Sequence, residues 1–408
     1  MIFALWSVFN ISSAQSWHKL SIPPQNWTGI TCSADGTKLA AAFFIPNYPT
    51  GNPVSPVYTS NDSGMTWSTN HDNFIMAESY GWTWAKITSS ADGSKIFALA
   101  DLNLMQSDDY GTNWLSSFVP AFGPLFNPLG AACSADGECL FAIYSSFQGN
   151  GDAYEYESHD HGLTWTSQYF PQSINDICCS ANGTKVYKSV ENDSVYVSHD
   201  SGGSWSSTSL SSPSWCWLAC SASGNTVAAA LCGGSIFISQ DSGASWTASS
   251  APAKQWDSIA ISAEGKKIFA TYPTQSVLRN GNWGPDYRGG IFASTDAGKT
   301  WVQAGTPNTN WVSIACSADG NKVYAVTGSG EVWMYQSTPS PELNLTAAND
   351  DLLLSWIIPV QNMVLQKSTN LISWLTITNV PVLNLSNLEN QVTLPFSGIG
   401  GFFRLSTP

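Results

Sequence analysis

Short runs of alternating apolar and polar residues dominate the chain. A representative stretch runs from Trp311 to Ser337 and reads WVSIACSADGNKVYAVTGSGEVWMYQS. We interpret it as one strand that ends at SADG, a second strand after that turn, and, beyond a loop, a third strand. No segment reaches the roughly 18 consecutive apolar residues that a membrane-spanning helix needs. The pattern therefore predicts an all-β protein with no transmembrane span.

A four-residue turn motif, SAxG, recurs seven times along the chain. Its serines are Ser33, Ser90, Ser134, Ser180, Ser221, Ser262 and Ser317. Neighbouring copies lie 41 to 57 residues apart, close to the roughly 40–50 residues that one four-stranded propeller blade requires. This spacing predicts a seven-bladed β-propeller over residues 15–337.

A second motif, SxDxGx[ST]W, alternates with the first and occurs six times. Its aspartates are Asp62, Asp109, Asp160, Asp200, Asp241 and Asp296. We place it at the turn into the fourth strand of each blade, with the tryptophan as the first residue of that strand. The seventh blade lacks a copy, and SWHKLS at residues 16–21 supplies its missing strand, which puts Trp17 at the common tryptophan position. An N-terminal strand that closes the ring removes free sheet edges.

The residue types of this second motif suit a structural role. In SHDSGGSW the Asp200 carboxylate and Ser198 are able to accept N–H groups of their own turn. Gly202 permits a positive φ, and Trp205 brings a large apolar surface between blades. We therefore interpret the six aspartates as structural residues.

The six copies resemble the Asp-box (BNR) repeats of sialidase-like, xyloglucanase-like and sortilin-type β-propellers. The resemblance covers roughly residues 15–337, and Asn113, in the position of Ser or Thr, is the one departure from the motif. It implies a propeller fold and no particular reaction, because such propellers include hydrolases as well as binding modules.

Residues 342–408 form a compositionally distinct tail after STPSPE. The segments LLLSW, VLQKSTNLISW and GGFFRL resemble the small β-sandwich tails of secreted bacterial proteins, which implies an immunoglobulin-like β-sandwich with a role in attachment or export. A domain this small buries little surface on its own, so we expect it to dock on the propeller.

Residues 1–14 are an apolar segment that ends in small residues. Two interpretations fit: a secretory leader cleaved near Ala14, or a strand that adds to the sheet edge of another molecule. Together with sequons such as NWT and NGT, the segment favours an extracellular or cell-surface location.

The charge balance excludes nucleic acid as a partner. The chain carries a formal net charge of -14, and its 15 Lys and Arg residues form no basic run, so it repels phosphate backbones. It also contains no phosphate-cradling loop and no cysteine–histidine cluster. We therefore expect neither a cofactor nor a metal.

The nine cysteines include five at one repeated position, directly before the serine of SAxG. They are Cys32, Cys133, Cys179, Cys220 and Cys316. We interpret them as small buried apolar residues. A disulfide between Cys133 and Cys139 across one turn, or between Cys216 and a neighbour, is the alternative.

The long loops are expected on the propeller face opposite both turn motifs, where binding residues usually lie. These loops span residues 43–57, 68–84, 145–156 and 271–290. Their aromatic residues include Tyr48, Tyr80, Trp82, Tyr154, Trp283 and Tyr287. Such rings either stack on sugars, form a protein interface, or only cap the blades.

The acidic and basic residues limit the catalytic options. A sialidase needs three arginines for the carboxylate of its substrate, whereas the propeller has only Arg279 and Arg288. A glycosidase needs only two carboxylates across a groove. Asp176 and Asp257, at the first strands of blades 4 and 6, are the candidate pair.

We conclude from the sequence that a non-catalytic extracellular structural or interaction protein is the best hypothesis. It would self-associate through the N-terminal strand or the C-terminal domain, or bind a glycan or cell-surface partner. The alternatives are a secreted glycoside hydrolase acting on a β-linked polysaccharide and a glycan-binding module without turnover.

Overall fold

The computed structural model describes most of the chain and shows only strands and turns. The described residues are 17–44, 56–69, 86–100, 103–118, 126–146, 152–212, 215–273, 275–279, 282–286, 289–337, 343–348, 351–357, 364–369, 373–384, 388–395 and 401–406. No helix occurs in these ranges, so the prediction of an all-β protein is confirmed there. It follows that no described segment is a helix able to cross a membrane.

Seven antiparallel sheets, each built on four main strands and one of them with a short fifth strand, make up the larger part of the molecule. Sheet 1 contains β2 (Asn26–Cys32), β3 (Leu39–Phe44), β4 (Val57–Ser60) and β5 (Ser68–Thr69). Sheet 2 contains β6 (Lys86–Ser89), β7 (Ile96–Ala100), β8 (Asn103–Ser107) and β9 (Leu115–Phe118). Sheet 3 contains β10 (Phe126–Cys133), β11 (Leu140–Ser146), β12 (Ala153–Ser158) and β13 (Thr166–Phe170). Sheet 4 contains β14 (Ile174–Cys179), β15 (Val186–Val190), β16 (Asp193–Ser198) and β17 (Ser206–Ser212).

The remaining three sheets follow the same plan. Sheet 5 contains β18 (Cys216–Cys220), β19 (Val227–Gly234), β20 (Ile236–Ser239) and β21 (Thr247–Ala248), with β22 (Lys254–Gln255) paired to the end of β19. Sheet 6 contains β23 (Ser258–Ile261), β24 (Ile268–Tyr272), β27 (Gly290–Ser294) and β28 (Val302–Gln303). Sheet 7 contains β29 (Trp311–Cys316), β30 (Lys322–Thr327), β31 (Val332–Gln336) and β1 (Trp17–Lys19).

The first strands of these sheets lie side by side in a closed ring. Each contacts the first strand of the next sheet, and β29 of sheet 7 contacts β2 of sheet 1. The alanines of the SAxG turns form a second, smaller ring at the strand ends. The N–H of each donates to the carbonyl oxygen of the alanine in the next sheet, at 2.6–3.0 Å, through Ala34, Ala91, Ala135, Ala181, Ala222, Ala263, Ala318 and back to Ala34. We call these residues the alanine ring.

Sheet 7 combines the two ends of this region of the chain. Strand β1 pairs with β31, with Trp17 opposite Tyr335. In sheet 5, Thr247 lies opposite Ile238, so the preceding residue, Trp246, is in register with Ser239. Trp17 is in register with Tyr335 in the same manner. The N-terminal strand therefore has the register of the fourth strand of the other sheets.

The hydrophobic core is divided into clusters between neighbouring sheets. Sheets 3 and 4, for example, share Phe141, Ile143, Ile177 and Val186, and Trp205 packs against them. Each of the other junctions also includes the tryptophan at the common position, namely Trp67, Trp114, Trp165, Trp246, Trp301 or Trp17. The repeated tryptophan thus fills the space between sheets.

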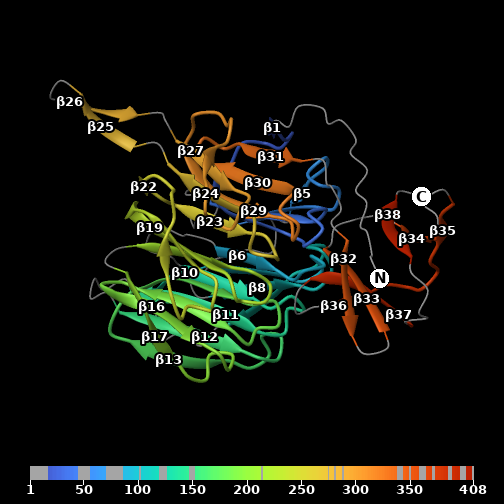
Figure 1. Cartoon of the computed structure of the whole chain (residues 1–408). Coiled ribbons are helices and arrows are strands. Elements are labelled where there is room, and N and C mark those ends of the chain that lie inside the picture. Colours follow the sequence, from blue (N-terminus) through green and yellow to red (C-terminus); the bar gives the residue numbers. More distant parts are fainter. Residues whose placement is uncertain are drawn as a thin grey trace.

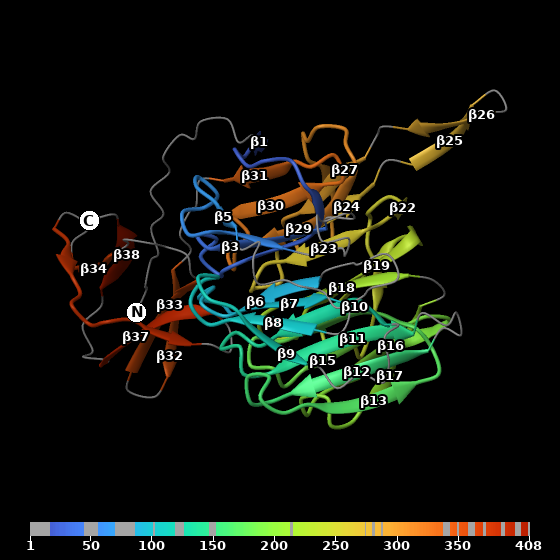
Figure 2. The same ribbon diagram turned by 180° about the vertical axis from the view of Figure 1, so that it is seen from behind.

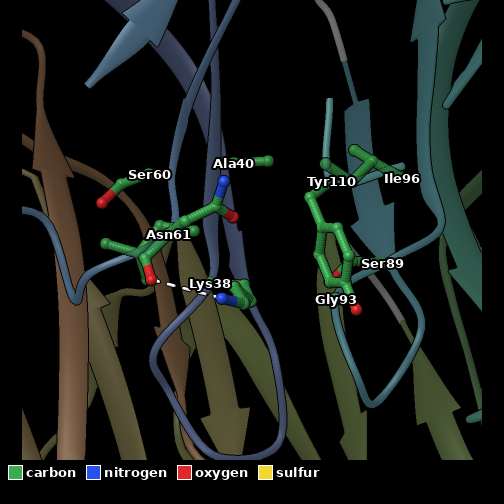
Figure 3. Close-up of a pocket in the computed structure, with 9 residues that line it drawn as sticks. Lys38, Ala40, Ser60, Asn61, Ser89, Gly93, Ile96 and Tyr110 are labelled. Carbon is green, nitrogen blue, oxygen red and sulfur yellow. Dashed lines mark hydrogen bonds between the residues drawn. The ribbon is translucent and has the colours of Figure 1, made fainter. Parts of the chain in front are cut away.

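Repeated lysines add polar contacts at the same junctions. Between sheets 1 and 2, Lys38 Nζ donates to the backbone carbonyl oxygen of Asn61 at 3.2 Å and lies 5.3 Å from the ring centre of Tyr110 (Figure 3). The crevice beside them has a volume of about 10 Å³, room for one water molecule at most. A Cβ atom on Gly93 would lie 2.6 Å from Lys38 Cβ. This junction is therefore packed and offers no ligand site.

The SxDxGx[ST]W turns share one hydrogen-bond pattern. In every copy the serine Oγ donates to the aspartate Oδ1 at 2.8–3.0 Å and accepts the glycine N–H at 2.8–2.9 Å. Two consecutive residues in each turn have a positive φ: the glycine, and the residue before it, whose φ is 59–61°. In the six sheets that carry this motif, the fourth strand begins one residue after the tryptophan, at Leu115 or Thr166 for example, and not at the tryptophan as predicted; in sheet 7, β1 does begin at Trp17.

A C-terminal region and a hairpin lie on opposite sides of the ring (Figures 1 and 2). The C-terminal region has one sheet of β32 (Asn344–Ala348), β33 (Asp351–Ile357), β37 (Glu389–Pro395) and β36 (Val382–Asn384). Its other sheet contains β35 (Leu375–Thr376), β34 (Val364–Ser368) and β38 (Phe402–Ser406), and the two sheets share one core around Leu354, Trp356 and Leu365.

The hairpin replaces part of a predicted loop. Residues 271–290 were expected to be a loop, but they include the paired strands β25 (Gln275–Arg279) and β26 (Asn282–Asp286). Asn280 and Gly281 stand between the two strands in the sequence, a residue pair that favours tight hairpin turns.

Candidate functional site on the axis of the ring

One strand position, four residues before the serine of each SAxG turn, differs in character from sheet to sheet. It is occupied by Gly29, Lys86, Gly130, Asp176, Trp217, Ser258 and Ser313. The first strands line the axis of the ring. The side chains at this position therefore give each sheet a different chemical group beside the axis.

In three places this position ties one sheet to the next through a hydrogen bond. The N–H of Ile314 donates to Ser258 Oγ at 3.3 Å, and that of Ile30 donates to Ser313 Oγ at 3.3 Å. The N–H of Leu218 donates to Asp176 Oδ2 at 2.8 Å. Asp176 therefore has a structural role that a serine also performs elsewhere.

Lys86 connects sheets that are not neighbours. Its Nζ lies 4.9 Å from the ring centre of Trp217. Sheets 2 and 5 are separated by sheets 3 and 4, so this contact crosses the axis. Trp217 Nε1 donates to the Trp256 carbonyl oxygen at 3.0 Å, which fixes the indole.

The environment of Trp217 includes a second, exposed indole. The ring centre of Trp215 is 6.1 Å from that of Trp217, with the planes tilted by 40°. Trp215 is 41% exposed. A ligand at Trp217 would therefore meet two adjacent aromatic surfaces.

The two carboxyl groups near Lys86 have altered acidity. Burial raises the pKa of Asp176 to about 6, although Lys86 and the N–H of Leu218 act in the opposite direction. Burial also raises the pKa of Asp257 to about 6, again opposed by Lys86. Both predicted candidate carboxylates therefore lie within the electrostatic reach of one cation.

We call Lys86, Asp176, Trp217 and Asp257 the axial cluster. It combines an ammonium donor, two carboxyl groups and an aromatic face; Lys86, Asp176 and Trp217 lie on first strands, and Asp257 directly precedes one. Such a set is able to hydrogen-bond hydroxyl or amide groups while the indole stacks on a ring. Carboxyls with pKa values near 6 are also able to exchange protons in mildly acidic solution.

The aromatic residues predicted for binding lie elsewhere where the structure describes them. Tyr154, on β12, has its ring centre 5.3 Å from that of Tyr169 on the neighbouring strand β13. Trp283 belongs to β26 in the hairpin. Tyr48, Tyr80, Trp82 and Tyr287 lie outside the described residues.

Lys86, Trp215 and Trp217 were not predicted as site residues from the sequence. Aligning the residues four before each SAxG serine would have placed Lys86 and Trp217 beside Asp176. That alignment still gives no sign that Lys86 reaches across the axis, because the contact depends on the radius of the ring.

The five repeated cysteines lie further along the axis, at the SAxG end. Together with Ser89, Ile261 and the alanine ring they line a cavity of about 190 Å³. Burial raises the pKa of the Cys133 and Cys316 thiols to about 12. These two thiols are therefore uncharged at neutral pH.

The disulfide alternatives are wrong for this structure. Cys133 and Cys139 form no disulfide, and neither does Cys216. Cys133 Sγ lies 3.4 Å from Thr88 Oγ1 of sheet 2, whereas Cys139 packs against Gly183 of sheet 4. The two sulfurs thus face different neighbours.

In the described part of the chain, no group of three or more His, Cys, Asp or Glu residues is arranged to hold a metal ion.

Comparisons with known proteins identify the fold. No protein family matches the chain, and no curated protein matches it significantly. The structure is similar to YCF48 from Cyanidioschyzon merolae, with a TM-score of 0.53, 13% sequence identity, and coverage of 79% of this chain and 98% of that one. It is also similar to YCF48 bound to D1 peptide, with a TM-score of 0.53, 14% identity, and coverage of 82% and 100%. YCF48 is a β-propeller, so the predicted β-propeller fold is confirmed.

Proposed function

We propose that this chain is a non-catalytic extracellular interaction protein. Its ring would be a seven-bladed Asp-box propeller and its C-terminal region an immunoglobulin-like sandwich. The seven sheets of the ring, the six equivalent SxDxGx[ST]W turns and the two-sheet C-terminal core support this architecture. Self-association through residues 1–14 or the C-terminal region remains part of the proposal; residues 1–14 lie outside the described residues.

The observation that carries the proposal is the convergence of the axial cluster from four different sheets. Elsewhere the same strand position needs only a serine to tie two sheets, as at Ser258 and Ser313. A cation that crosses the axis and opposes the burial-induced rise in pKa of two carboxyl groups exceeds that structural need. Charged groups with shifted pKa values on a scaffold favour a binding site.

The ligand class that fits this cluster best is a glycan. Indole faces stack on pyranose rings, and carboxylate and ammonium groups hydrogen-bond sugar hydroxyls. A peptide is the competing class, and it is favoured by the neighbour solved with a bound peptide.

A glycoside hydrolase is the second candidate function. It is favoured by one observation, the pKa of about 6 at both Asp176 and Asp257. A general acid must hold its proton near the working pH, and a second carboxyl must act opposite it.

Binding to glycan and peptide arrays tests the proposal. We expect saturable binding that weakens about tenfold or more in Trp215→Ala and Lys86→Met, because each change removes a contact worth about 1–2 kcal/mol. Tyr169→Ala is the matched control, since Tyr169 is 51% exposed on an outer strand. Binding that survives both Trp215→Ala and Lys86→Met would contradict the site.

The same samples separate binding from turnover. Incubation of a bound polysaccharide should release no new reducing ends. Release that disappears in Asp176→Asn and Asp257→Asn would instead establish the hydrolase.

A further inference from the structure

A lysine and a glutamate occupy buried positions that are apolar elsewhere in the ring. Eight residues after the serine of the SAxG turn, sheet 4 carries Lys188 and the other six sheets carry an alanine, namely Ala41, Ala98, Ala142, Ala229, Ala270 and Ala325. Three residues before the serine of the SxDxGx[ST]W turn, sheet 3 carries Glu155 and the five other copies carry Val57, Leu104, Val195, Ile236 and Ile291. All of these residues are at most 1% exposed, Lys188 and Glu155 included. The fold itself therefore needs no charge at either position.

The two side chains meet across the junction between sheets 3 and 4. Glu155 lies on β12 and Lys188 on β15, and Lys188 Nζ donates to Glu155 Oε2 at 2.5 Å. The same nitrogen lies 3.8 Å from the ring centre of Phe170 and 3.8 Å from that of Trp205. The two aromatic rings thus hold the nitrogen beside the carboxyl group and keep water away from it.

Burial makes the charged form of this pair costly. It raises the pKa of Glu155 to about 7, against the opposing effect of Lys188. It also lowers the pKa of Lys188, against the opposing effect of Glu155. Among the described residues, Glu155 Oε1 has no hydrogen-bond partner, so the charge of the carboxylate is compensated on one oxygen only. Transfer of the shared proton to Glu155 gives a neutral amine beside a carboxylic acid, and neither strand has to move.

A neutral amine in contact with a carboxylic acid is the reactant pair for an amide. A lysine amine becomes a nucleophile when desolvation lowers its pKa. Reactants held in contact in a good orientation behave as if present at about 10⁵–10⁸ M. Surroundings that exclude water also favour a reaction that releases water. The fold therefore supplies proximity, a nucleophile and dry surroundings at one place.

A second carboxyl group stands next to the pair. Glu157 follows Glu155 by two residues on β12, so its side chain leaves the strand on the same face. Its side chain is only 13% exposed. Burial raises the pKa of Glu157, and the charge of Lys188 opposes this rise. A carboxyl group of this kind is able to take a proton from a nitrogen and pass it to a leaving oxygen.

We propose that Lys188 and Glu155 condense to an amide, which makes this pair a site of self-modification that links sheet 3 covalently to sheet 4. Lys188 Nζ attacks Glu155 Cδ, so one N–C bond forms and one C–O bond of the carboxyl group breaks. The oxygen leaves as water with the carboxyl proton and one proton from the nitrogen, which Glu157 transfers. The step needs no oxidant and no co-reactant, and one neutral amide replaces a buried charge pair. The link is independent of the ligand that the axial cluster binds.

Peptide mass spectrometry of the folded full-length protein tests the proposal. The protein is incubated at neutral pH, sampled over several days, denatured, and digested with trypsin and a second protease. We expect a branched peptide that contains both Glu155 and Lys188 and weighs one water molecule less than the two segments it joins. Trypsin should also fail to cut after Lys188, because the amine is acylated. A sample kept in urea throughout should not gain the link, since only the fold holds the two groups in contact.

Three variants identify the reacting groups. Lys188→Met removes the nucleophile and should abolish the branched peptide, whereas Lys185→Met changes a neighbouring lysine whose Nζ donates to Asn225 and Ser242 and should retain it. Glu157→Gln keeps the shape of the side chain but carries no proton, so the link should form about tenfold more slowly or less. An unchanged rate in Glu157→Gln would overturn the role given to Glu157. Unlinked peptides of full mass in the folded wild type would overturn the proposal whether or not a variant folds.

Discussion

Asn113 shows how a departure from a motif preserves its interactions. In the first copy, the Thr66 N–H donates to Asp62 Oδ1 at 2.8 Å and its hydroxyl donates to Oδ2 at 2.6 Å. In the second copy, the Asn113 N–H and side-chain amide make the same two bonds to Asp109, at 2.7 and 2.6 Å. The turn thus requires a donor of suitable reach at this position, and a hydroxyl is only the common choice.

The carboxylates of these turns remain ionised in ordinary conditions. Hydrogen bonds from the Thr300 and Ser204 side chains, followed by further turn donors, lower the pKa values of Asp296 and Asp200 to about 2. These residues contrast with the axial carboxyls, whose pKa values are raised. The chain therefore holds two classes of aspartate, one with lowered and one with raised pKa values. Only the axial carboxyls titrate near pH 6.

Asp176 should make stability depend on pH. Its pKa is raised, so the folded state keeps the proton that the unfolded chain releases between about pH 4 and pH 6. The wild type therefore loses stability as pH rises through that window, by at most about 3 kcal/mol, which is what linkage gives for a carboxyl whose pKa rises from about 4 to about 6 on folding. Asp176→Asn retains an oxygen for the Leu218 N–H and cannot ionise.

Urea denaturation at pH 4 and pH 7.5 measures this effect. We expect Asp176→Asn to equal the wild type at pH 4 and to exceed it by about 1–3 kcal/mol at pH 7.5. A constant difference between the two proteins across the range would show that Asp176 does not carry a raised pKa.

Each SxDxGx[ST]W turn packs closely against the neighbouring sheet, and this contact helps to hold the sheets together. Gly298, in the sixth SxDxGx[ST]W turn, has a φ of 82°, and a Cβ atom there would lie 2.6 Å from Ile238 Cγ1 of sheet 5. Gly111 stands in the same relation to Thr59 of sheet 1. The motif glycine therefore serves the junction between sheets as well as the turn.

Gly298→Ala should destabilise the fold by about 2–4 kcal/mol, because it combines an unfavourable φ with steric overlap against a packed core. The loss should be smaller in an Ile238→Ala background, where the overlapping atom is absent; a double-mutant cycle in urea measures the coupling. Gly305→Ala is the matched control, since the Cβ atom that an alanine adds there would have no neighbouring atom within 4 Å. Additive effects at 298 and 238 would refute the steric explanation.

Closure of the ring depends on the three-residue strand β1. The ring centre of Trp17 on β1 lies 5.9 Å from that of Trp311 and 5.6 Å from that of Tyr335. Without β1, strand β31 would present an unpaired edge, which favours association with other chains.

Trp17→Ala should therefore lower stability by about 3 kcal/mol, the usual loss for a large aromatic side chain in a core, and should increase aggregation on heating. His18→Ala changes the adjacent, exposed residue of the same strand and should have little effect. Calorimetry with light scattering measures both quantities, and equal effects at 17 and 18 would contradict the role given to Trp17.

The fold was more predictable than the candidate site. The all-β class and the β-propeller fold follow from repeated local patterns, and both are confirmed, because each motif carries its own turn chemistry. The number of blades and the Asp-box assignment remain predictions. The second positive φ in each SxDxGx[ST]W turn leaves no signal in the sequence, since Ser63, Tyr110 and Ala297 have no common chemistry.

Only two of the four residues of the axial cluster could be predicted from the sequence, and the reason is physical. Asp176 and Asp257 are visible in the sequence as acids at the starts of first strands. The approach of Lys86 to Trp217 joins residues from non-neighbouring sheets, and it depends on the ring diameter and on side-chain direction, which a linear repeat does not determine.

The alanine ring has a consequence for how the molecule comes apart. A row of repeats has two outer members, each with a single neighbour, and it frays from those ends. A cycle has no outer member, because every sheet in it is bonded to two others. Removing any one sheet would break two interfaces at once, so the ring has no weak end from which stepwise melting begins, and its sheets should be lost together.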